Sequence, residues 1–209
     1  MSKLYLMRHG ETEYNVDHRM QGISDSPLTE NGVAQAQRAA RWLAAHNIEP
    51  AYFVCSPLWR AGETLAVVME GLGKADTPHA SDDGLIEMSF GSYDGLHFWE
   101  TPFYEGTQGQ ISGLEADEDL FVQFGGTSMD EVGQAMHDAL VRAMRAAEGG
   151  DVLAVAHRRC IMYFLRRVRG YWEDVRSRTG NCSVLEFSYD ETREEPFELL
   201  AYLDTQEDA

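Results

Sequence analysis

Short apolar runs, separated by stretches with helical spacing, constrain the fold of this chain more than any other feature. The runs lie at 4–7, 51–55 and 151–156, with two more near the C-terminal end at 183–187 and 197–203. They are rich in branched or aromatic residues, and the first three show no alternation of apolar with polar residues. Uninterrupted runs of this kind are typical of strands that are buried on both faces.

The intervals between these runs carry apolar residues at three- and four-residue spacing, which predicts helices. The clearest helix is expected at 28–46, where Thr29 is the candidate N-cap. Similar periodicity predicts helices within 60–72, 128–148 and 160–168. Strands that alternate with helices favour a parallel sheet covered on both faces. We therefore predict an α/β fold, a three-layer sandwich in which a mostly parallel central sheet is flanked by helices.

The length of 209 residues fits one domain, because domains usually have about 100 to 200 residues. Within this single domain, 1–209, the segment 92–127 breaks the strand-helix rhythm with glycines, an acidic stretch at 115–119 and seven aromatic residues: Tyr93, Phe98, Trp99, Phe103, Tyr104, Phe121 and Phe124. We predict that this segment is a lid or insertion that faces the substrate, with an extra pair of helices as the alternative. Such a lid would favour a leaving group with an apolar or planar surface over a polyanion.

The excess of acidic residues limits the classes of partner. The chain has 35 acidic and 17 basic residues and a net charge of −18, which repels nucleic acid and anionic membranes. No apolar run approaches the roughly 18 residues of a membrane span, and no signal peptide is visible. Three widely spaced cysteines suit free thiols in a reducing compartment. We therefore expect a cytoplasmic protein, monomeric or homodimeric, in which any anion site is local.

Basic residues and histidines follow the first three apolar runs, at the point where each predicted strand ends. Arg8 and His9 follow the first run, Arg60 lies shortly after the second, and His157 and Arg158 follow the third. If the three strands are parallel, their carboxyl ends meet at one edge of the sheet. Guanidinium groups match phosphate oxygens two at a time, so this edge is predicted to bind a phosphate group.

The two histidines allow two chemical interpretations. Histidine is the commonest metal ligand, but His9 and His157 are each flanked by arginine, which repels a divalent cation, and the chain has no H-E-x-x-H or C-x-x-C spacing. We therefore expect neither a metal nor another cofactor. Nearby guanidinium groups lower the pKa of a histidine, which keeps its ring neutral and its lone pair free for nucleophilic attack.

The stretch LYLMRHGETEYN, residues 4–15, resembles the R-H-G motif of the histidine phosphatase superfamily, the phosphoglycerate-mutase-like proteins. Five further blocks resemble segments of that family and occur in the family order, at 20–36, 56–65, 85–95, 152–161 and 180–187. Together the blocks extend over nearly the whole chain. An R-H-G triplet alone is a weak signal, whereas several blocks in the correct order are a specific one.

The resemblance implies a covalent phosphohistidine on His9 and a general acid at Glu87. It also implies a group of residues around the transferred phosphoryl group: Arg8, Arg60, His157, Asn15, and Gln21 or Gly22. An unperturbed glutamate is ionised at neutral pH, but a bound phosphate dianion would favour its protonated form. Phosphoryl transfer mainly requires positioning and stabilisation of charge, which such a set of residues can supply.

Two positions depart from the pattern of that family. Arg158 follows the second histidine, where the family commonly has glycine. Its side chain either points outward as a surface charge or adds a cation for a further group of the substrate. In the sequence GGTSMDE, Thr127 stands where the family has glutamate, although Ser128 and Glu131 are present. The usual contacts of that glutamate are therefore in doubt.

The function expected from the resemblance is a metal-independent phosphomonoesterase that acts on a small phosphorylated metabolite. A cofactor-dependent phosphoglycerate mutase is the nearest alternative, because the resemblance alone does not exclude it. The resemblance implies that such mutases have longer chains with inserted segments that are not found in this sequence. A non-catalytic phosphate-binding module is the alternative from another class, suggested by Arg158 and Thr127.

Overall fold

The central sheet has six strands, and the computed structural model describes residues 2–102, 119–170 and 178–206 of the chain. The strands are β1 (Ser2–Arg8), β2 (Tyr52–Cys55), β3 (Ala80–Ser81), β4 (Val152–Ala156), β5 (Val184–Tyr189) and β6 (Phe197–Leu203). Their order across the sheet is β3-β2-β4-β1-β5-β6. Strands β1 to β4 run parallel, β5 is antiparallel to β1, and β6 is antiparallel to β5. The sheet is therefore mixed, with its parallel part around β1 and β4.

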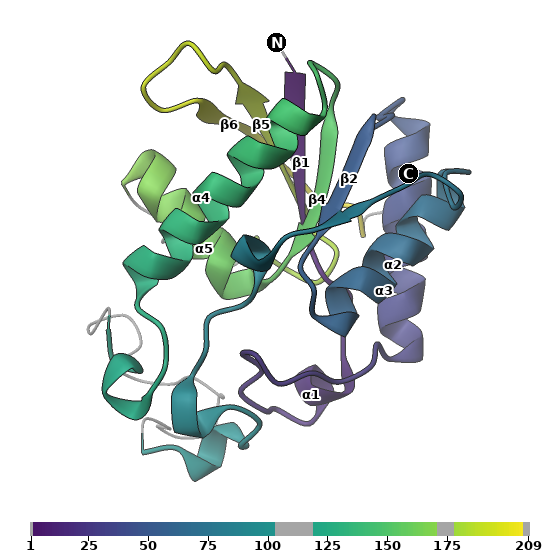
Figure 1. The fold of residues 1–209 in the computed structure, drawn as a ribbon. Helices are drawn as coiled ribbons and strands as arrows, with labels where there is room; N and C mark the ends of the chain where they lie inside the picture. The colour runs from purple at the N-terminus through teal and green to yellow at the C-terminus, as the bar shows by residue number, and fades with distance from the viewer. Residues whose placement is uncertain (1, 103–118, 171–177, 207–209) are drawn as a thin grey trace.

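Helices cover both faces of this sheet (Figure 1). Helices α2 (Glu30–Ala45) and α3 (Trp59–Gly71) lie on one face, and α4 (Met129–Ala146) and α5 (Arg158–Arg169) lie on the other. Thr29 is the N-cap of α2 and accepts a hydrogen bond from the N–H of Gly32, as the sequence predicts. The predicted α/β fold with three layers is confirmed.

The alternation of side chains along β1 shows how one strand supplies two cores. Leu4 and Leu6 are buried in the apolar cluster beneath α4 and α5, whereas Tyr5 and Met7 are buried in the cluster beneath α2 and α3. Successive side chains of a strand point to opposite faces, so a strand with helices on both sides must be apolar throughout. This is the physical reason why the run at 4–7 shows no polar alternation.

Most of the short elements in the described residues lie beyond the carboxyl ends of the parallel strands, in the lower part of Figure 1, whereas η1 (Asp83–Leu85) packs beside α4. The short elements are α1 (Glu13–Val16) and four 3₁₀ helices: η1, η2 (Gly91–Tyr93), η3 (Phe98–Glu100) and η4 (Val122–Phe124). Thr12 caps α1, and Asp82 caps η1. Neither these elements nor the two-residue strand β3 was expected, because all of them are shorter than a periodic pattern can mark.

The described parts of the segment 92–127 contain 3₁₀ helices and no pair of α-helices. Phe121 is buried in the core, and Tyr93 packs edge-on against Phe124 with ring centroids 4.9 Å apart. Trp99 is exposed and stacks on the ring of His97. Phe103, Tyr104 and residues 115–118 of the acidic stretch lie outside the described residues. The lid function of the segment stays a prediction.

Cys55, Cys160 and Cys182 are free and buried. Among the residues that the structure describes, no helix is long and apolar enough to cross a membrane.

Candidate active site

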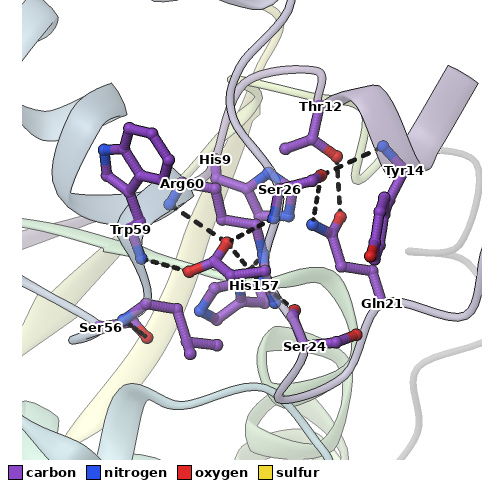
Figure 2. Close-up of polar contacts among 12 residues, drawn as sticks. His9, Thr12, Tyr14, Gln21, Ser24, Ser26, Ser56, Trp59, Arg60 and His157 are labelled. Atoms are coloured by element: carbon purple, nitrogen blue, oxygen red, sulfur yellow. Dashed lines mark hydrogen bonds and ion pairs between the residues drawn. The ribbon is translucent and has the colours of Figure 1, made fainter. Parts of the chain in front are cut away.

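Three chain segments bring their functional side chains to the carboxyl edge of the parallel strands. His9 follows β1 and His157 follows β4, and these strands are neighbours in which Arg8 pairs with Ala156. The ring centroids of the two histidines lie 5.2 Å apart, with the ring planes inclined by 55°. Arg60, the second residue of α3, reaches His157 from the third segment, as Figure 2 shows. The groups at the three predicted strand ends thus share one site.

His9 is held by a hydrogen bond at one of its two ring nitrogens. Its Nδ1 lies 2.7 Å from the carbonyl oxygen of Gly10. A carbonyl oxygen can only accept a hydrogen bond, so Nδ1 carries the proton and Nε2 carries the lone pair. Burial, followed by the charges of Arg8 and Arg60, lowers the pKa of His9 well below its ordinary value. The sequence predicted this direction from the arginines alone, whereas burial makes the larger contribution.

The backbone that carries His9 is tied to several elements. Its N–H donates to the carbonyl of Ala156 at 3.0 Å, and its carbonyl accepts from Nδ2 of Asn181 at 3.0 Å. The next N–H, of Gly10, donates to Oγ1 of Thr64 at 3.0 Å. A Cβ atom at Gly10 would lie 2.7 Å from the carbonyl oxygen of Gly32 in α2, so only glycine fits there. His9 therefore sits on a backbone turn that several elements hold in place.

Arg60 is fully buried and forms four hydrogen bonds with the protein. Its Nε donates to Nδ1 of His157 at 3.1 Å, and its Nη2 donates to the carbonyl of Gly22 at 2.8 Å. Its Nη1 donates to the carbonyl of Ser24 at 2.9 Å and to Oδ1 of Asp25 at 3.0 Å. The charge of Arg60 lies inside the site, but most of its donors are already used.

His157 is completely buried, and its Nε2 has no hydrogen-bond partner among the described residues. Burial is the main cause of a pKa well below the ordinary value, and the charges of Arg60, His9 and Arg8 add to it. His157 is therefore a neutral imidazole at physiological pH.

Arg8 and Arg158 add two half-buried guanidinium groups to the site. Nη1 of Arg8 donates to the carbonyl of Thr179 at 2.9 Å, while its buried Nε has no partner among the described residues. Burial and then the charge of Arg158 lower the pKa of Arg8 to about 10, so Arg8 stays a cation at neutral pH. Burial also lowers the pKa of Arg158, which Glu87 partly opposes. Arg158 thus lies within the electrostatic reach of the site and does not extend fully into solvent.

Glu87 lies against the first turn of α5, close behind His157. Its Oε1 accepts the N–H groups of Cys160 and Met88, each at 2.9 Å, and its Oε2 accepts the N–H of Arg159 at 3.0 Å. The side chain is buried, with only 7 % of the residue exposed. The free N–H groups at a helix start attract a negative charge, which explains why the carboxylate docks there.

Asn15 lies in α1, and Gln21 and Gly22 lie in the loop that follows this helix. Oε1 of Gln21 accepts from Oγ1 of Thr12 at 2.8 Å, as Figure 2 shows, and from Nδ2 of Asn15 at 3.5 Å. The N–H of Gly22 donates to Oδ1 of Asp94 at 2.8 Å, and its carbonyl accepts from Arg60. All three residues are near the site, but the amide of Gly22 is bound to a carboxylate.

Thr127 has a definite contact despite its departure from the family pattern. Its Oγ1 accepts the N–H of Ser89 at 3.0 Å, and its own N–H donates to the carbonyl of Ser89 at 3.1 Å. Thr127 therefore supports the segment that carries Glu87. Ser128 and Glu131 form a reciprocal capping box at the start of α4.

Four residues that the sequence left unassigned support the site: Asp25, Thr64, Thr179 and Asn181. Asp25 accepts hydrogen bonds from Arg60 and from the N–H groups at the start of α3. Asp25, Thr64 and Asn181 stand within the blocks 20–36, 56–65 and 180–187, but no local pattern connects Asp25 with an arginine 35 positions away. In the described residues, no cluster of three or more histidine, cysteine or acidic side chains could hold a metal ion.

Comparisons with known proteins agree with this arrangement. The family model of the histidine phosphatase superfamily (branch 1) matches residues 4–201. A curated relative, the probable phosphoglycerate mutase GpmB of Salmonella paratyphi C, is 29% identical over 205 residues, which cover 92% of this chain and 87% of the relative.

Two solved structures are similar over nearly their full length. Phosphoglycerate mutase from Bacillus anthracis matches with a TM-score of 0.78 and 24% identity, covering 98% of this chain and 94% of that one, which supports the fold. A mutant of phosphoserine phosphatase from Entamoeba histolytica in complex with phosphoserine matches with a TM-score of 0.76 and 25% identity, covering 99% and 98% of the two chains.

Proposed function

The chain belongs to the histidine phosphatase superfamily (branch 1), and on this premise we propose that it is a metal-independent phosphomonoesterase. In this proposal it hydrolyses a small phosphorylated metabolite through a phosphohistidine intermediate on His9. The observation that carries the proposal is the state of His9, a buried neutral ring with the proton on Nδ1 and the lone pair on Nε2. Such a nitrogen is ready to attack phosphorus.

The reaction proceeds in two halves. In the first half, Nε2 of His9 attacks the phosphorus atom while the bond between phosphorus and the ester oxygen breaks. Glu87 gives its proton to the departing oxygen, so an alcohol leaves. In the second half, Glu87 takes a proton from water as the water oxygen attacks phosphorus. The bond between phosphorus and Nε2 then breaks, its electron pair returns to His9, and inorganic phosphate leaves.

Charge stabilisation in this proposal comes from the side chains around His9. Arg8 and Arg60 provide fixed positive charge in a buried site, where electrostatic interactions are stronger than in water. A loose phosphoryl transfer mainly requires positioning and neutralisation of the equatorial oxygens. The two guanidinium groups can therefore do what a metal ion does in other phosphatases.

The position of Glu87 suits a proton carrier. Its Oε2 accepts a single hydrogen bond, from the N–H of Arg159. A carboxyl oxygen has two lone-pair directions, so Oε2 keeps one direction for the proton that it exchanges with the leaving group. A carboxyl group in this place can give a proton to the ester oxygen in the first half of the reaction and take one from water in the second.

Phosphoenzyme formation and a chelator control together test this proposal. We expect the purified chain to hydrolyse an aryl phosphate at the same rate with and without excess chelator, and to form an acid-labile phosphoenzyme. The His9→Ala variant should lose both activities. Full hydrolysis by His9→Ala contradicts the proposal, and binding of vanadate without any phosphoenzyme supports a phosphate-binding module instead.

A phosphoglycerate mutase is the second candidate, supported by the names of the Salmonella relative and the Bacillus structure. The Entamoeba structure supports the phosphatase. The assay that separates them measures conversion of 3-phosphoglycerate with and without a bisphosphate primer. Primer-dependent isomerisation faster than release of phosphate would favour the mutase.

The substrate that we propose carries a second anionic group, such as a carboxylate, close to the phosphate, in place of the apolar or planar leaving group expected from the composition of 92–127. Arg158 supports this choice, because its half-buried charge acts on both Arg8 and Glu87. We further propose a cytoplasmic enzyme, in keeping with its three free thiols. A panel of phosphorylated metabolites ranked by kcat/KM tests the substrate class, and leading rates for neutral phosphate esters would contradict it.

A further inference from the structure

Arg60 uses most of its hydrogen-bonding capacity on the protein itself. A guanidinium group has five N–H donors, and four of those of Arg60 are directed at His157, Ser24, Asp25 and Gly22. The group that the sequence predicts as a phosphate clamp is thus mainly bound to its own chain. Its most unusual partner is the ring of His157, which a cationic donor contacts directly.

Asp25 determines the placement of this guanidinium group. Its Oδ1 accepts from Nη1 of Arg60 at 3.0 Å, and its two oxygens accept the backbone N–H groups of Trp59 and Arg60. The same carboxylate therefore anchors the first turn of α3 and the side chain that projects from it. Figure 2 shows Arg60 lying between the start of α3 at Trp59 and the ring of His157.

The contact with Arg60 decides where His157 holds its proton. The Nε of arginine is always a donor, so Nδ1 of His157 must accept. A neutral His157 then carries its hydrogen on Nε2. That atom is buried without a partner among the described residues, and its ring adjoins that of His9. A buried N–H without a partner is costly unless a ligand satisfies it.

The same contact prevents His157 from becoming a cation. Protonation would place a second hydrogen on Nδ1, facing the N–H of Arg60 at 3.1 Å. The charged or titratable neighbours of the ring, Arg60 on α3 with His9 and Arg8 at the end of β1, all disfavour a positive charge there. His157 can therefore donate a hydrogen bond but is not equipped to exchange protons with the substrate.

We propose that Asp25 is a positioning residue that, through Arg60, holds His157 with its proton on Nε2, so that His157 acts as a neutral hydrogen-bond donor to the phosphoryl group. The donor role rests on the proposed phosphatase function. The position of the proton does not, because it is a property of the protein without substrate.

The test is nuclear magnetic resonance of the full chain labelled with ¹⁵N in its histidine rings, with the His157 signals assigned by comparison with His157→Gln. We expect a single Nε2–H tautomer that does not titrate between about pH 5 and 8, the range in which histidine ordinarily changes charge. In Asp25→Ala we expect a second population with Nδ1–H, or titration within that range. The kcat for an aryl phosphate should fall roughly 10- to 100-fold, with a smaller change in KM.

Two further variants complete the design. Asp25→Asn keeps an acceptor oxygen for the start of α3 and therefore a folded chain, and we expect it to shift the tautomer in the same direction as Asp25→Ala. Asp82→Asn is the matched control, because Asp82 also caps a helix and pairs with an arginine, Arg142, but at an exposed place. It should leave the His157 signals and kcat unchanged.

Two results would overturn the inference. One is Nδ1–H on His157 in the unmodified protein. The other is an unchanged tautomer and pH profile in both folded Asp25 variants, which would reduce Asp25 to a helix cap. If the tautomer is as expected but no phosphoenzyme forms, the proposed function fails and the placement of the proton by Asp25 stands.

Discussion

The site contains two buried histidines that carry their hydrogen on opposite ring nitrogens. At the end of β1, Nδ1 of His9 donates to the carbonyl of Gly10, which leaves a lone pair on Nε2. At the end of β4, Nδ1 of His157 accepts from Arg60, which places the hydrogen on Nε2. Both rings are neutral for the same reason, burial next to guanidinium groups.

The difference between them shows that the chemical role of a histidine here follows from its Nδ1 partner. A carbonyl oxygen next to Nδ1 leaves Nε2 as a hydrogen-bond acceptor with a free lone pair. A guanidinium donor next to Nδ1 leaves Nε2 as a hydrogen-bond donor. The ring centroids lie 5.2 Å apart, so in the proposed reaction the two rings would offer a nucleophile and a donor to one phosphoryl group. Two neutral histidines can thereby cooperate without either changing charge before the reaction.

Replacing each histidine by alanine should separate the two roles most strongly. His9→Ala removes the nucleophile, so we expect kcat for an aryl phosphate to fall by roughly 10⁴-fold or more. His157→Ala removes one donor to the phosphoryl group, for which roughly 10²- to 10³-fold is typical. Rapid-quench detection of acid-labile phosphate should find a slowly formed phosphoenzyme in His157→Ala and none in His9→Ala. A phosphoenzyme in His9→Ala would contradict these different roles of the two histidines.

Glu87→Gln tests whether proton transfer belongs to the carboxylate, as the fixed proton of His157 implies. We expect a loss of roughly 10²- to 10⁴-fold in kcat for an alkyl phosphate, whose alcohol needs a proton to leave. For a nitrophenyl phosphate the first half-reaction should lose much less, since that leaving group departs unprotonated. Steady-state rates and burst amplitudes on both esters measure this, and an equal loss on both burst rates would speak against Glu87 as the acid.

Each histidine has an adjacent arginine, and Arg158→Ala tests the one beside His157. We expect KM for a phosphate ester with a neighbouring carboxylate to rise about tenfold, the effect of roughly one charge-assisted hydrogen bond, while KM for phenyl phosphate changes little. Arg159→Ala is the matched control, because Arg159 donates to the hydroxyl of Tyr163 instead. Equal changes in KM on both esters, or from both variants, would refute an anion contact by Arg158.

The smallest effect concerns stability, where the two histidines should behave alike. The pKa of each ring is lower in the folded chain than the value of about 6.5 expected when unfolded. As the pH falls, the unfolded chain binds protons first, so the stability contributed by the neutral rings is complete above about pH 6.5 and declines below it. The loss should approach about 1.4 kcal/mol per pH unit for each histidine.

Denaturant unfolding at about pH 7.5 and about pH 5.5 measures this decline in the free energy of unfolding. The range is chosen because carboxylates with lowered pKa values change the free energy of unfolding only at lower pH. His9→Gln and His157→Gln should each remove the contribution of one histidine to the dependence of the free energy of unfolding on pH. An unchanged slope in either variant would show that the ring in question is not buried in its neutral form.

Much of the fold could be predicted because the signals were long and local. The apolar runs at 4–7, 51–55 and 151–156 correspond to β1, β2 and β4, and the helix expected at 28–46 corresponds to α2. Strand β3, with two residues, carries no periodicity and was missed. The burial of the aromatic residues in 92–127 was not predictable: Phe121 is buried in the core whereas Trp99 is exposed, because composition shows that a residue is aromatic and not which side it faces.

The sequence by itself determined the fold class and the meeting of His9, Arg60 and His157. Residues that follow parallel strands share one edge of the sheet, so their order along the chain is sufficient for that conclusion. Only the tertiary structure decided what each group does there. The donors of Arg60 are taken up by residues 35 to 97 positions away in sequence, among them Asp25 and His157. The position of a proton depends on such contacts, because a hydrogen bond requires a donor and an acceptor within about 3 Å, a distance that only folding sets.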